Sequence, residues 1–535
     1  MCAAARSDPA PHHDPDHIAE LETSQLSGGH LPAWIQDSPY WLIAVLVHVI
    51  GLFIFGTIVM LEAVEEEHEI ITIVRLVPEE KVYKPLPHTT LYDTPPIDQP
   101  PSPHVKMETK VKPVEQDRRK AEKPKPMAEL GLFGDPDLSW GAPAVGTPTG
   151  GVPGGGNNAV RAALEWLKRH QHPDGHWSSH GFHENCNSEE HGALCNFTNQ
   201  LDSGTGTDSG FEGYDVGVTG LALLAIVGFG YTHTSGEDRE LRECVRRGVQ
   251  WLIAEQVHST DPALDGLFCT PSETTDEWIY NHAIATLAMA DLLLSSRQRL
   301  HLTPPTQSAV NWCLRAQNPG FGWKYGYQTG KNDTSVTGWM VFALKSAKAC
   351  GHAHLIKFDK AEFETAFAGA IAWIEAVTSS HTGITGYEAP GDEGSRLQKV
   401  HGENYPYSKE LSCMTAVGVL TRVFAGQGRR TDAMRAAVSH LVGNLPEWRP
   451  TTGKRQSKIN FYSWYYATYA LYQIGGAPWK KWVEALAPTM VDNQRKLGCE
   501  DGSWDPIGEW GCAGGRVYST AMGALILEVY DRSRR

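Results

Sequence analysis

The sequence lacks an excess of positive charge, because its 47 lysine and arginine residues are outnumbered by 62 aspartate and glutamate residues. The formal net charge is −15, and no stripe of basic residues with interleaved aromatics is present. Proteins that hold nucleic acid use clustered Lys and Arg, which displace counterions from the phosphates. Nucleic acid is therefore excluded as a partner.

The cysteines lack a pairing motif, since ten of them are scattered through 535 residues without a single Cys-x-x-Cys. This absence excludes zinc-ribbon and thioredoxin-type sites, which need that spacing. Apolar residues are plentiful: 41% of the chain is hydrophobic, and 17 residues are tryptophan. The chain is long and apolar enough to build a sizeable core.

Residues 1–39 lack the apolar core of a secretory signal and carry one basic residue, Arg6, so we expect a disordered tail. Residues 40–61 contain no Asp, Glu, Lys or Arg, and about 20 apolar residues suffice for a helix to cross a bilayer. The sequence therefore predicts a single-pass protein anchored in the lipid bilayer, with its large domain on the extracytoplasmic side. A buried core helix is the alternative for this segment.

Residues 62–157 are rich in proline, and fifteen of the chain's 33 prolines lie between residues 78 and 153. This composition favours extended polyproline II, a semi-rigid spacer, and the glycines at 154–156 favour a flexible joint. We expect a disordered linker, which in composition resembles the spacers of TonB-like bacterial envelope proteins.

One unit recurs six times between residue 158 and the C-terminus. In its clearest copies a predicted helix ends at a glutamine, and a turn with glycine and tryptophan follows: Gln171 to Trp177, Gln317 to Trp323, and Gln494 to Trp504. A strongly apolar segment of helical length comes next in every copy, at residues 216–227, 278–294, 335–347, 411–424, 465–474 and 518–530. Glycine or proline in the turn ends the first helix of a unit, so the pattern predicts six helical hairpins.

The Gln–Gly–Trp pattern resembles the QW repeat of squalene–hopene cyclases and the related repeat of protein prenyltransferase β subunits. The resemblance covers residues 158–535 and implies an all-α fold, an (α/α)6 toroid of six outer and six inner helices around a central cavity. The physical argument agrees, because a hairpin cannot bury its apolar helix alone, whereas a closed ring of six buries all of them. The glutamine and tryptophan are expected to tie neighbouring hairpins together.

Six polar residues fall at equivalent positions near the starts of the predicted inner helices: Asp215, Asn281, Asp333, Glu410, Ser463 and Arg516. A closed ring would bring them to one mouth of the cavity. Asp215, Asp333 and Glu410 are candidate general acid and base residues, because burial and mutual repulsion split the pKa values of facing carboxylates. The structural alternative is helix capping, with an ion pair between Arg516 and Glu410 or Asp215.

A further set of residues is expected to line the cavity or contact a ligand: His282, Lys409, Tyr462, Trp464, Arg516 and Tyr518. Residues 461–466 are almost all aromatic, which suits isoprenoid chains, carbocations or stacked sugars, and which core packing explains equally well. The resemblance thus points to a terpenoid cyclase or prenyltransferase-like protein that binds an apolar, isoprenoid-like or peptide ligand.

The catalytic motifs of these families are absent from the sequence. No Asp-x-Asp-Asp proton donor occurs, and no Asp, Cys and His trio can be matched to the zinc ligands of the prenyltransferases. Catalysis is therefore left open, with no cofactor and no metal expected. The alternatives are a non-catalytic binding or scaffold module and a glycan-active enzyme, because other α/α toroids use facing carboxylates on sugars.

The first hairpin also contains an insert rich in metal-binding residue types, namely His183, Cys186, His191 and Cys195. These side chains could hold zinc, although their spacing is not that of a standard finger. The alternatives are disulfides, Cys186–Cys195 and Cys499–Cys512, or unpaired thiols.

Overall fold

The computed structural model describes residues 156–186, 195, 208–269, 278–391, 413–428, 431–450, 457–508 and 510–532. All of them belong to the second of the two compact units into which the chain divides, residues 117–535. The predicted tail, membrane span and nearly all of the predicted linker lie outside the described residues.

The membrane location predicted from the sequence needs correction. Within the described ranges, no helix combines the length and the hydropathy that a bilayer crossing requires. This finding overturns the expectation of a single-pass membrane protein with an extracytoplasmic toroid. The segment on which that expectation was based, residues 40–61, is itself outside the described part.

The described part of the chain contains twelve α-helices and no strand. Six are amphipathic and form an outer layer: α3 (Gly156–Arg169), α6 (Arg239–Glu255), α8 (Thr303–Ala316), α10 (Lys360–Ala376), α13 (Asp432–Gly443) and α15 (Gly476–Val491). Six form an inner layer: α5 (Asp215–Gly228), α7 (Trp278–Ser295), α9 (Thr334–His352), α12 (Cys413–Phe424), α14 (Phe461–Ile474) and α16 (Gly511–Arg532). Two short 3-10 helices, η2 (Phe182–Asn185) and η3 (Gly498–Glu500), lie in the connections.

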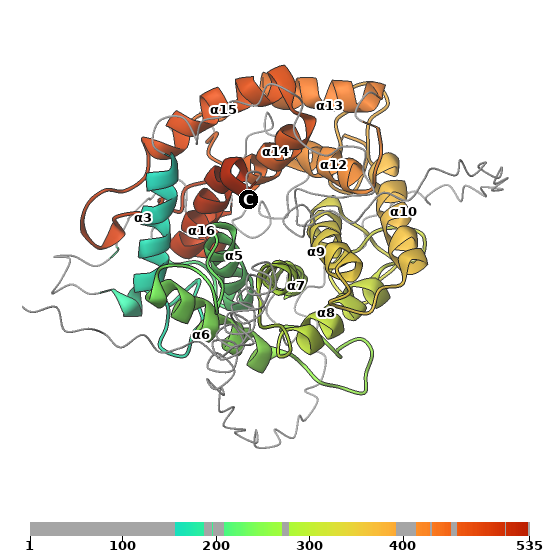
Figure 1. The fold of residues 1–535 in the computed structure, drawn as a ribbon. Coiled ribbons are helices and arrows are strands. Elements are labelled where there is room, and N and C mark those ends of the chain that lie inside the picture. The colour runs from blue at the N-terminus through green and yellow to red at the C-terminus, as the bar shows by residue number, and fades with distance from the viewer. Residues whose placement is uncertain are drawn as a thin grey trace, which may run out of the picture. The chain divides into compact units, whose positions relative to one another are not determined.

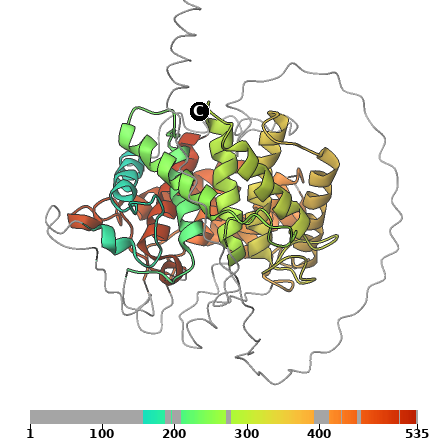
Figure 2. The same ribbon diagram turned by 90° about the horizontal axis from the view of Figure 1, so that it is seen from below.

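The inner helices form a closed ring, and the outer helices surround it (Figure 1). Each inner helix packs against the next, and α16 returns to contact both α5 and α3. Figure 2 shows the same ring turned by 90°. The predicted all-α toroid of six hairpins is confirmed.

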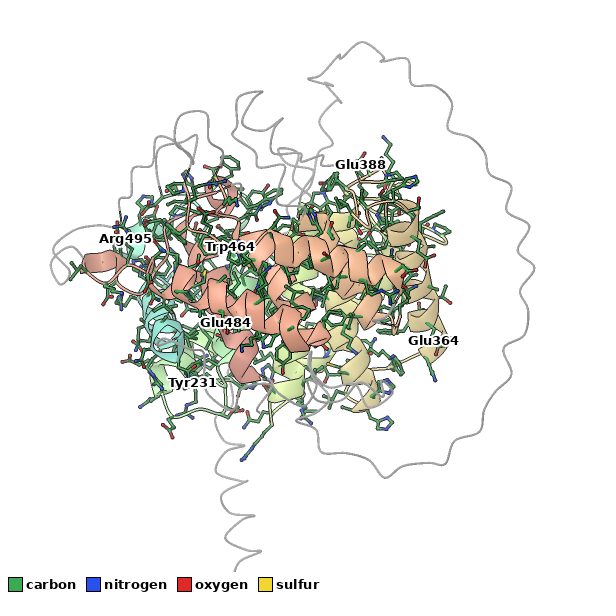
Figure 3. The ribbon with its side chains drawn as sticks, turned by 90° about the horizontal axis from the view of Figure 1, so that it is seen from above. Tyr231, Glu364, Glu388, Trp464, Glu484 and Arg495 are labelled. Carbon is green, nitrogen blue, oxygen red and sulfur yellow. The ribbon has the colours of Figure 1, made fainter. Side chains whose placement is uncertain are left out.

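Composition explains which helix goes to which layer. Every residue of α5 from Val216 to Val227 is buried, because this helix has neighbours on all sides. In α6 the buried residues recur every three or four positions and most of the others are charged, as in a helix with one face to solvent. Glu364 on α10 and Glu484 on α15 are exposed on the outside of the ring (Figure 3).

In four of the six copies the glutamine of the repeat joins one hairpin to the next. Gln171 donates from Nε2 to the carbonyl of Gly175 in its own turn, at 2.7 Å, and to that of Cys244 in α6, at 2.9 Å. Gln256 and Gln317 make the equivalent pairs of bonds, which reach α8 and α10. This confirms the role that the sequence predicted for the glutamine.

The last copy closes the ring in the same way. Gln494 donates to the carbonyl of Ala159 in α3, at 2.7 Å, as well as to its own turn. Gly502 in that turn has φ +92°, and a Cβ there would lie 2.1 Å from the carbonyl oxygen of Ala162. Only glycine combines this backbone angle with such a close approach to α3.

The repeat tryptophans share one setting. The three of them donate from Nε1 to a carbonyl of their own outer helix or its end, at 2.7–2.8 Å, in the pairs Trp177–Leu167, Trp323–Cys313 and Trp504–Met490. Their own backbone N–H groups donate to threonine hydroxyls of the inner helices: Thr219, Thr337 and Thr520. These tryptophans therefore pin outer helix, turn and inner helix together.

Candidate functional site

A cavity of about 90 Å³ lies at the N-terminal ends of the inner helices. Its walls come from the first turns of α5, α7, α9, α14 and α16. Six aromatic residues take part in the lining: Tyr214, Tyr280, Trp339, Tyr462, Trp510 and Tyr518. The remaining lining residues are small or mostly apolar: Gly217, Val218, Leu221, Asn281, Ile284, Ser335, Ala513 and Gly514.

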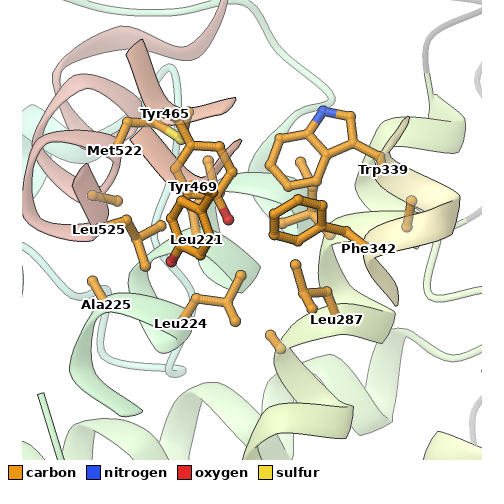
Figure 4. Close-up of a cluster of buried hydrophobic side chains, with 14 of the residues drawn as sticks. Leu221, Leu224, Ala225, Leu287, Trp339, Phe342, Tyr465, Tyr469, Met522 and Leu525 are labelled. Atoms are coloured by element: carbon orange, nitrogen blue, oxygen red, sulfur yellow. The ribbon is translucent and has the colours of Figure 1, made fainter. Parts of the chain in front are cut away.

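Further along the same helices, aromatic side chains fill the middle of the ring (Figure 4). The ring of Trp339 stacks on that of Tyr465, with centroids 5.7 Å apart and planes at 19°. Phe342 meets Tyr469 edge-on at 5.5 Å, and Tyr465 contacts Tyr469 at 4.7 Å. The cavity therefore has a floor of packed aromatic rings.

Four polar side chains of the lining, those of Tyr280, Ser335, Tyr462 and Asn281, are bonded to one another or to backbone. The Tyr280 hydroxyl donates to Ser335 Oγ at 2.9 Å, and Ser335 Oγ lies 2.8 Å from the Tyr462 hydroxyl. Asn281 accepts from the N–H of Gly217, at 3.0 Å, and donates to a carbonyl just before α5. Burial raises the pKa of Tyr280 and Tyr462 well above the usual value, so both phenols stay protonated.

Asp333 begins α9, two residues before Ser335 of the lining. It is 0% exposed, its Oδ1 accepts from the Val336 N–H at 2.7 Å, and its Oδ2 is buried with no hydrogen-bond partner. Burial raises the pKa of Asp333 from 3.8 to about 7, against the opposing effect of the Val336 N–H. This helix cap is therefore also a carboxyl group that changes charge near neutral pH.

Asp333 is not itself among the lining residues of the cavity, and no other predicted acid that the structure describes is found there. Asp215 begins α5, accepts from the backbone N–H and the hydroxyl of Ser179, at 2.8 and 3.1 Å, and lies 3.7 Å from His176 Nε2. It is not part of the lining. Glu410 and Lys409 lie outside the described residues.

Of the five remaining predicted cavity residues, Tyr462 and Tyr518 are in the lining. His282 is in the core: its Nδ1 accepts from the Phe268 N–H at 3.2 Å, and burial lowers its pKa to about 3. Trp464 is buried away from the cavity against other aromatic rings (Figure 3).

Arg516 is fully buried in an ion-pair network outside the lining. It lies 2.7 Å from an oxygen of Asp208 and 2.8 Å from one of Asp505, and it donates to Ser503 Oγ at 2.7 Å. Among the described residues, the partners of Arg516 therefore do not include the Asp215 considered from the sequence. The lining residues that the sequence did not suggest include Tyr280, which directly precedes Asn281, and Ser335 and Trp339, which follow Asp333 by two and six residues.

Of the alternatives considered from the sequence, the disulfides are wrong, because Cys186, Cys195 and Cys499 form no disulfide bond. The zinc set proposed from the sequence also changes: His183 is exposed, and His191 is outside the described residues. Cys186 and Cys195 instead gather with Cys499 and with His170, which sequence analysis missed. The predicted closure of the ring could have indicated this cluster, since closure places the last turn, which contains Cys499, beside the first outer helix, which His170 follows.

No protein-family model matches the sequence, and no curated protein matches it either. Several solved structures align with part of this chain. The α-1,6-mannanase of Salegentibacter sp. HEL1_6 aligns with a TM-score of 0.44 and 9% identity, over 70% of this chain and 99% of that one. A type II terpene cyclase from Scytonema, in complex with geranylgeranyl dihydroxybenzoate, aligns with a TM-score of 0.40 and 11% identity, over 71% and 97%. A protein from Actinoplanes aligns at 0.37 and 15%, over 71% and 100%. These likenesses carry no argument about activity.

Proposed function

We propose that the protein binds an apolar, isoprenoid-like ligand in the aromatic cavity. The observation that carries this proposal is the mainly aromatic and aliphatic surface of the lining, in which the polar groups of Tyr280, Ser335, Tyr462 and Asn281 already bond within the protein. A polar ligand would bury groups without partners, at about 1–3 kcal/mol for each one. An apolar chain gains about 0.8 kcal/mol for each CH₂ that it buries.

The chemistry of the wall favours an unsaturated chain over the alternatives. A peptide brings an amide group with every residue, and the lining offers few partners for it. A glycan-active site needs two carboxylates that face one cavity, whereas Asp215 and Asp333 are both engaged at helix starts. Alkene and methyl groups pack directly against rings such as Trp339 and Tyr462.

The test is binding of farnesol to the full chain, followed by quenching of tryptophan fluorescence. Trp339 and Trp510 are in the wall and report on an occupied cavity. Val218→Phe fills the cavity from α5, and we expect its affinity for farnesol to fall at least about tenfold, since the added ring takes the ligand's space. Val438→Phe on the outer helix α13, where the side chain is partly buried, is the matched control.

The proposal fails if Val218→Phe binds farnesol as well as the wild type and the Val438→Phe control do. Thermal melts followed by circular dichroism check that both variants remain folded. A scaffold module without a ligand makes the opposite prediction, namely that none of the three proteins shows saturable quenching.

Acid catalysis on the bound chain is a second candidate, favoured by the acidity of Asp333, which is not a lining residue but lies two residues before Ser335 of the lining. Its carboxyl group is buried, and burial brings its pKa to about 7, the range in which a general acid works best at neutral pH. Asp333→Asn keeps the helix cap and removes the acid. Loss of conversion of a polyene such as geranylgeraniol with retained binding would support this role, and unchanged conversion would exclude it.

A further inference from the structure

Four side chains from opposite ends of the ring converge on one point. Nε2 of His170 lies 3.5 Å from Sγ of Cys186, 3.5 Å from Sγ of Cys195 and 3.3 Å from Sγ of Cys499. All four ligand atoms lie within 4.8 Å of one another, although His170 and Cys499 are 329 positions apart in the sequence. We propose that these four side chains bind a Zn²⁺ ion that fastens the first hairpin of the ring to the last.

The distances fit a tetrahedral site. With Zn–S bonds of about 2.3 Å and Zn–N bonds of about 2.0–2.1 Å, the nitrogen and sulfur vertices of a tetrahedron lie about 3.5 Å apart. The three observed separations of 3.3–3.5 Å match this edge. Three thiolates and an imidazole are a ligand set that selects zinc over magnesium or calcium, which prefer oxygen.

The orientation of His170 is already that of a metal ligand. Its Nδ1 lies 2.9 Å from the carbonyl oxygen of Trp166, so Nδ1 carries the proton and Nε2 turns its lone pair to the sulfurs. The Trp166 ring stacks on the imidazole at 4.1 Å and 18°, which fixes the plane of His170. One lone pair can accept from only one of three thiols, whereas a cation bound at the centre satisfies all four groups.

The surroundings indicate a structural metal site. His170 is 0% exposed, and Cys195 and Cys499 are 5% and 2% exposed, while Cys186 is half-buried and leaves a route of entry. Four protein ligands leave no coordination position open for substrate. Catalytic zinc sites keep one position open, so this ion would hold the fold together without taking part in chemistry.

The site lies at the seam of the ring, which is the junction where the last hairpin meets the first. His170 follows α3 directly, Cys186 follows η2, and Cys499 is in η3 between α15 and α16. The same seam is joined by the bond from Gln494 to Ala159 and by the bond from Arg169 to the Asp501 carbonyl, at 2.8 Å. A metal would add a strong link between segments far apart in sequence, beside the helix packing, the Arg516–Asp208 ion pair and the hydrogen bonds that already close the ring.

The test uses the full chain, purified without chelator, and elemental analysis for zinc. We expect one zinc per chain, and replacement by Co²⁺ should give tetrahedral d–d bands with thiolate-to-cobalt charge transfer. Cys499→Ser should lose the metal and the cobalt spectrum. Cys350→Ser is the matched control, because Cys350 is equally buried and its Sγ bonds to the Ala290 carbonyl, a contact that a hydroxyl group keeps.

A second measurement covers the case in which Cys499→Ser does not fold. Wild-type protein stripped with a strong chelator should melt at a lower temperature, and added Zn²⁺ should restore the original Tm while Mg²⁺ should not. The proposal is overturned if the wild type neither holds zinc nor changes its Tm with zinc, if thiol counting finds two of the three cysteines in a disulfide, or if folded Cys499→Ser retains one zinc.

Discussion

Replacing Asp333 with asparagine should change how the stability of the protein depends on pH. Asparagine keeps an oxygen to accept from the Val336 N–H, so the cap of α9 is preserved. The substitution also removes the carboxyl group, so the side chain can no longer ionise. Because burial raises the pKa of Asp333 from 3.8 to about 7, that group is costly to ionise in the folded state.

The direction in which stability changes with pH follows from the protons that the folded and unfolded states bind. Between about pH 4 and pH 7 the folded protein holds a proton on Asp333 that the unfolded chain has released, so the free energy of unfolding falls as pH rises through this window. The destabilisation reaches its full value above the pKa that Asp333 has in the folded protein. A difference of 7 minus 3.8, at 1.36 kcal/mol for each pKa unit, gives at most about 4 kcal/mol, of which about 2–3 kcal/mol appears between pH 5 and pH 8.

The asparagine variant should lack this slope. Its amide NH₂ replaces an oxygen that has no hydrogen-bond partner, which costs about 1–3 kcal/mol at every pH. Asp333→Asn should therefore be less stable than the wild type at pH 5 and as stable or more stable at pH 8. Urea denaturation at several pH values measures the difference between the two curves.

Asp359→Asn provides the control, because Asp359 caps α10 through Ala361 and Glu362 and is exposed. Its curve should run parallel to that of the wild type, which removes effects of other titrating groups. Parallel curves for Asp333→Asn as well would refute the assignment of a raised pKa to Asp333.

Two further substitutions test the ring itself. Gly502→Ala should lower the free energy of unfolding by several kcal/mol in a urea titration, since its Cβ would meet the Ala162 carbonyl at 2.1 Å. Gly320→Ala is the control: Gly320 also has positive φ but has open space around it, so this substitution should cost only about 1 kcal/mol of backbone strain. Arg516→Leu leaves Asp208 buried without its cation and should cost about 3–5 kcal/mol, and Arg516→Lys should cost less; equal losses would mean that the charge is unimportant.

The hairpins could be predicted from the sequence because the requirements of each turn are local. A glutamine, a glycine with positive φ and a tryptophan satisfy one turn and one neighbouring helix, and these residues are close in sequence, as in Gln171 to Trp177. Helix ends were less certain. Residues 335–347 were expected in the third inner helix, and α9 runs from Thr334 to His352, because its last turns stay buried between neighbours.

The candidate site was harder to predict, because polar residues at a helix start have two uses. Asn281 and Asp333 are both predicted to face the cavity, and the oxygens of both accept from backbone N–H groups at helix starts. Asn281 does line the cavity, whereas beyond Asp333 the lining is formed by Ser335 and Trp339, two and six residues further along the chain. The metal-ligand cluster was missed for another reason, because its members come together only when the ring is closed.

Closure of the ring and the shape of the cavity depend on the same segment. Ala513 and Gly514 line the cavity, and the N–H of Phe211 donates to the Ala513 carbonyl at 2.8 Å, so the start of α16 is held by the first hairpin. Gly515 bends the helix there with φ +68°, and a Cβ at that position would lie 2.6 Å from the backbone nitrogen of Gly210. The start of α16 therefore forms one wall of the cavity and also belongs to the junction between the last hairpin and the first. We therefore expect a metal that links the first and last hairpins to affect ligand binding in the cavity, although none of its four ligands lines the cavity.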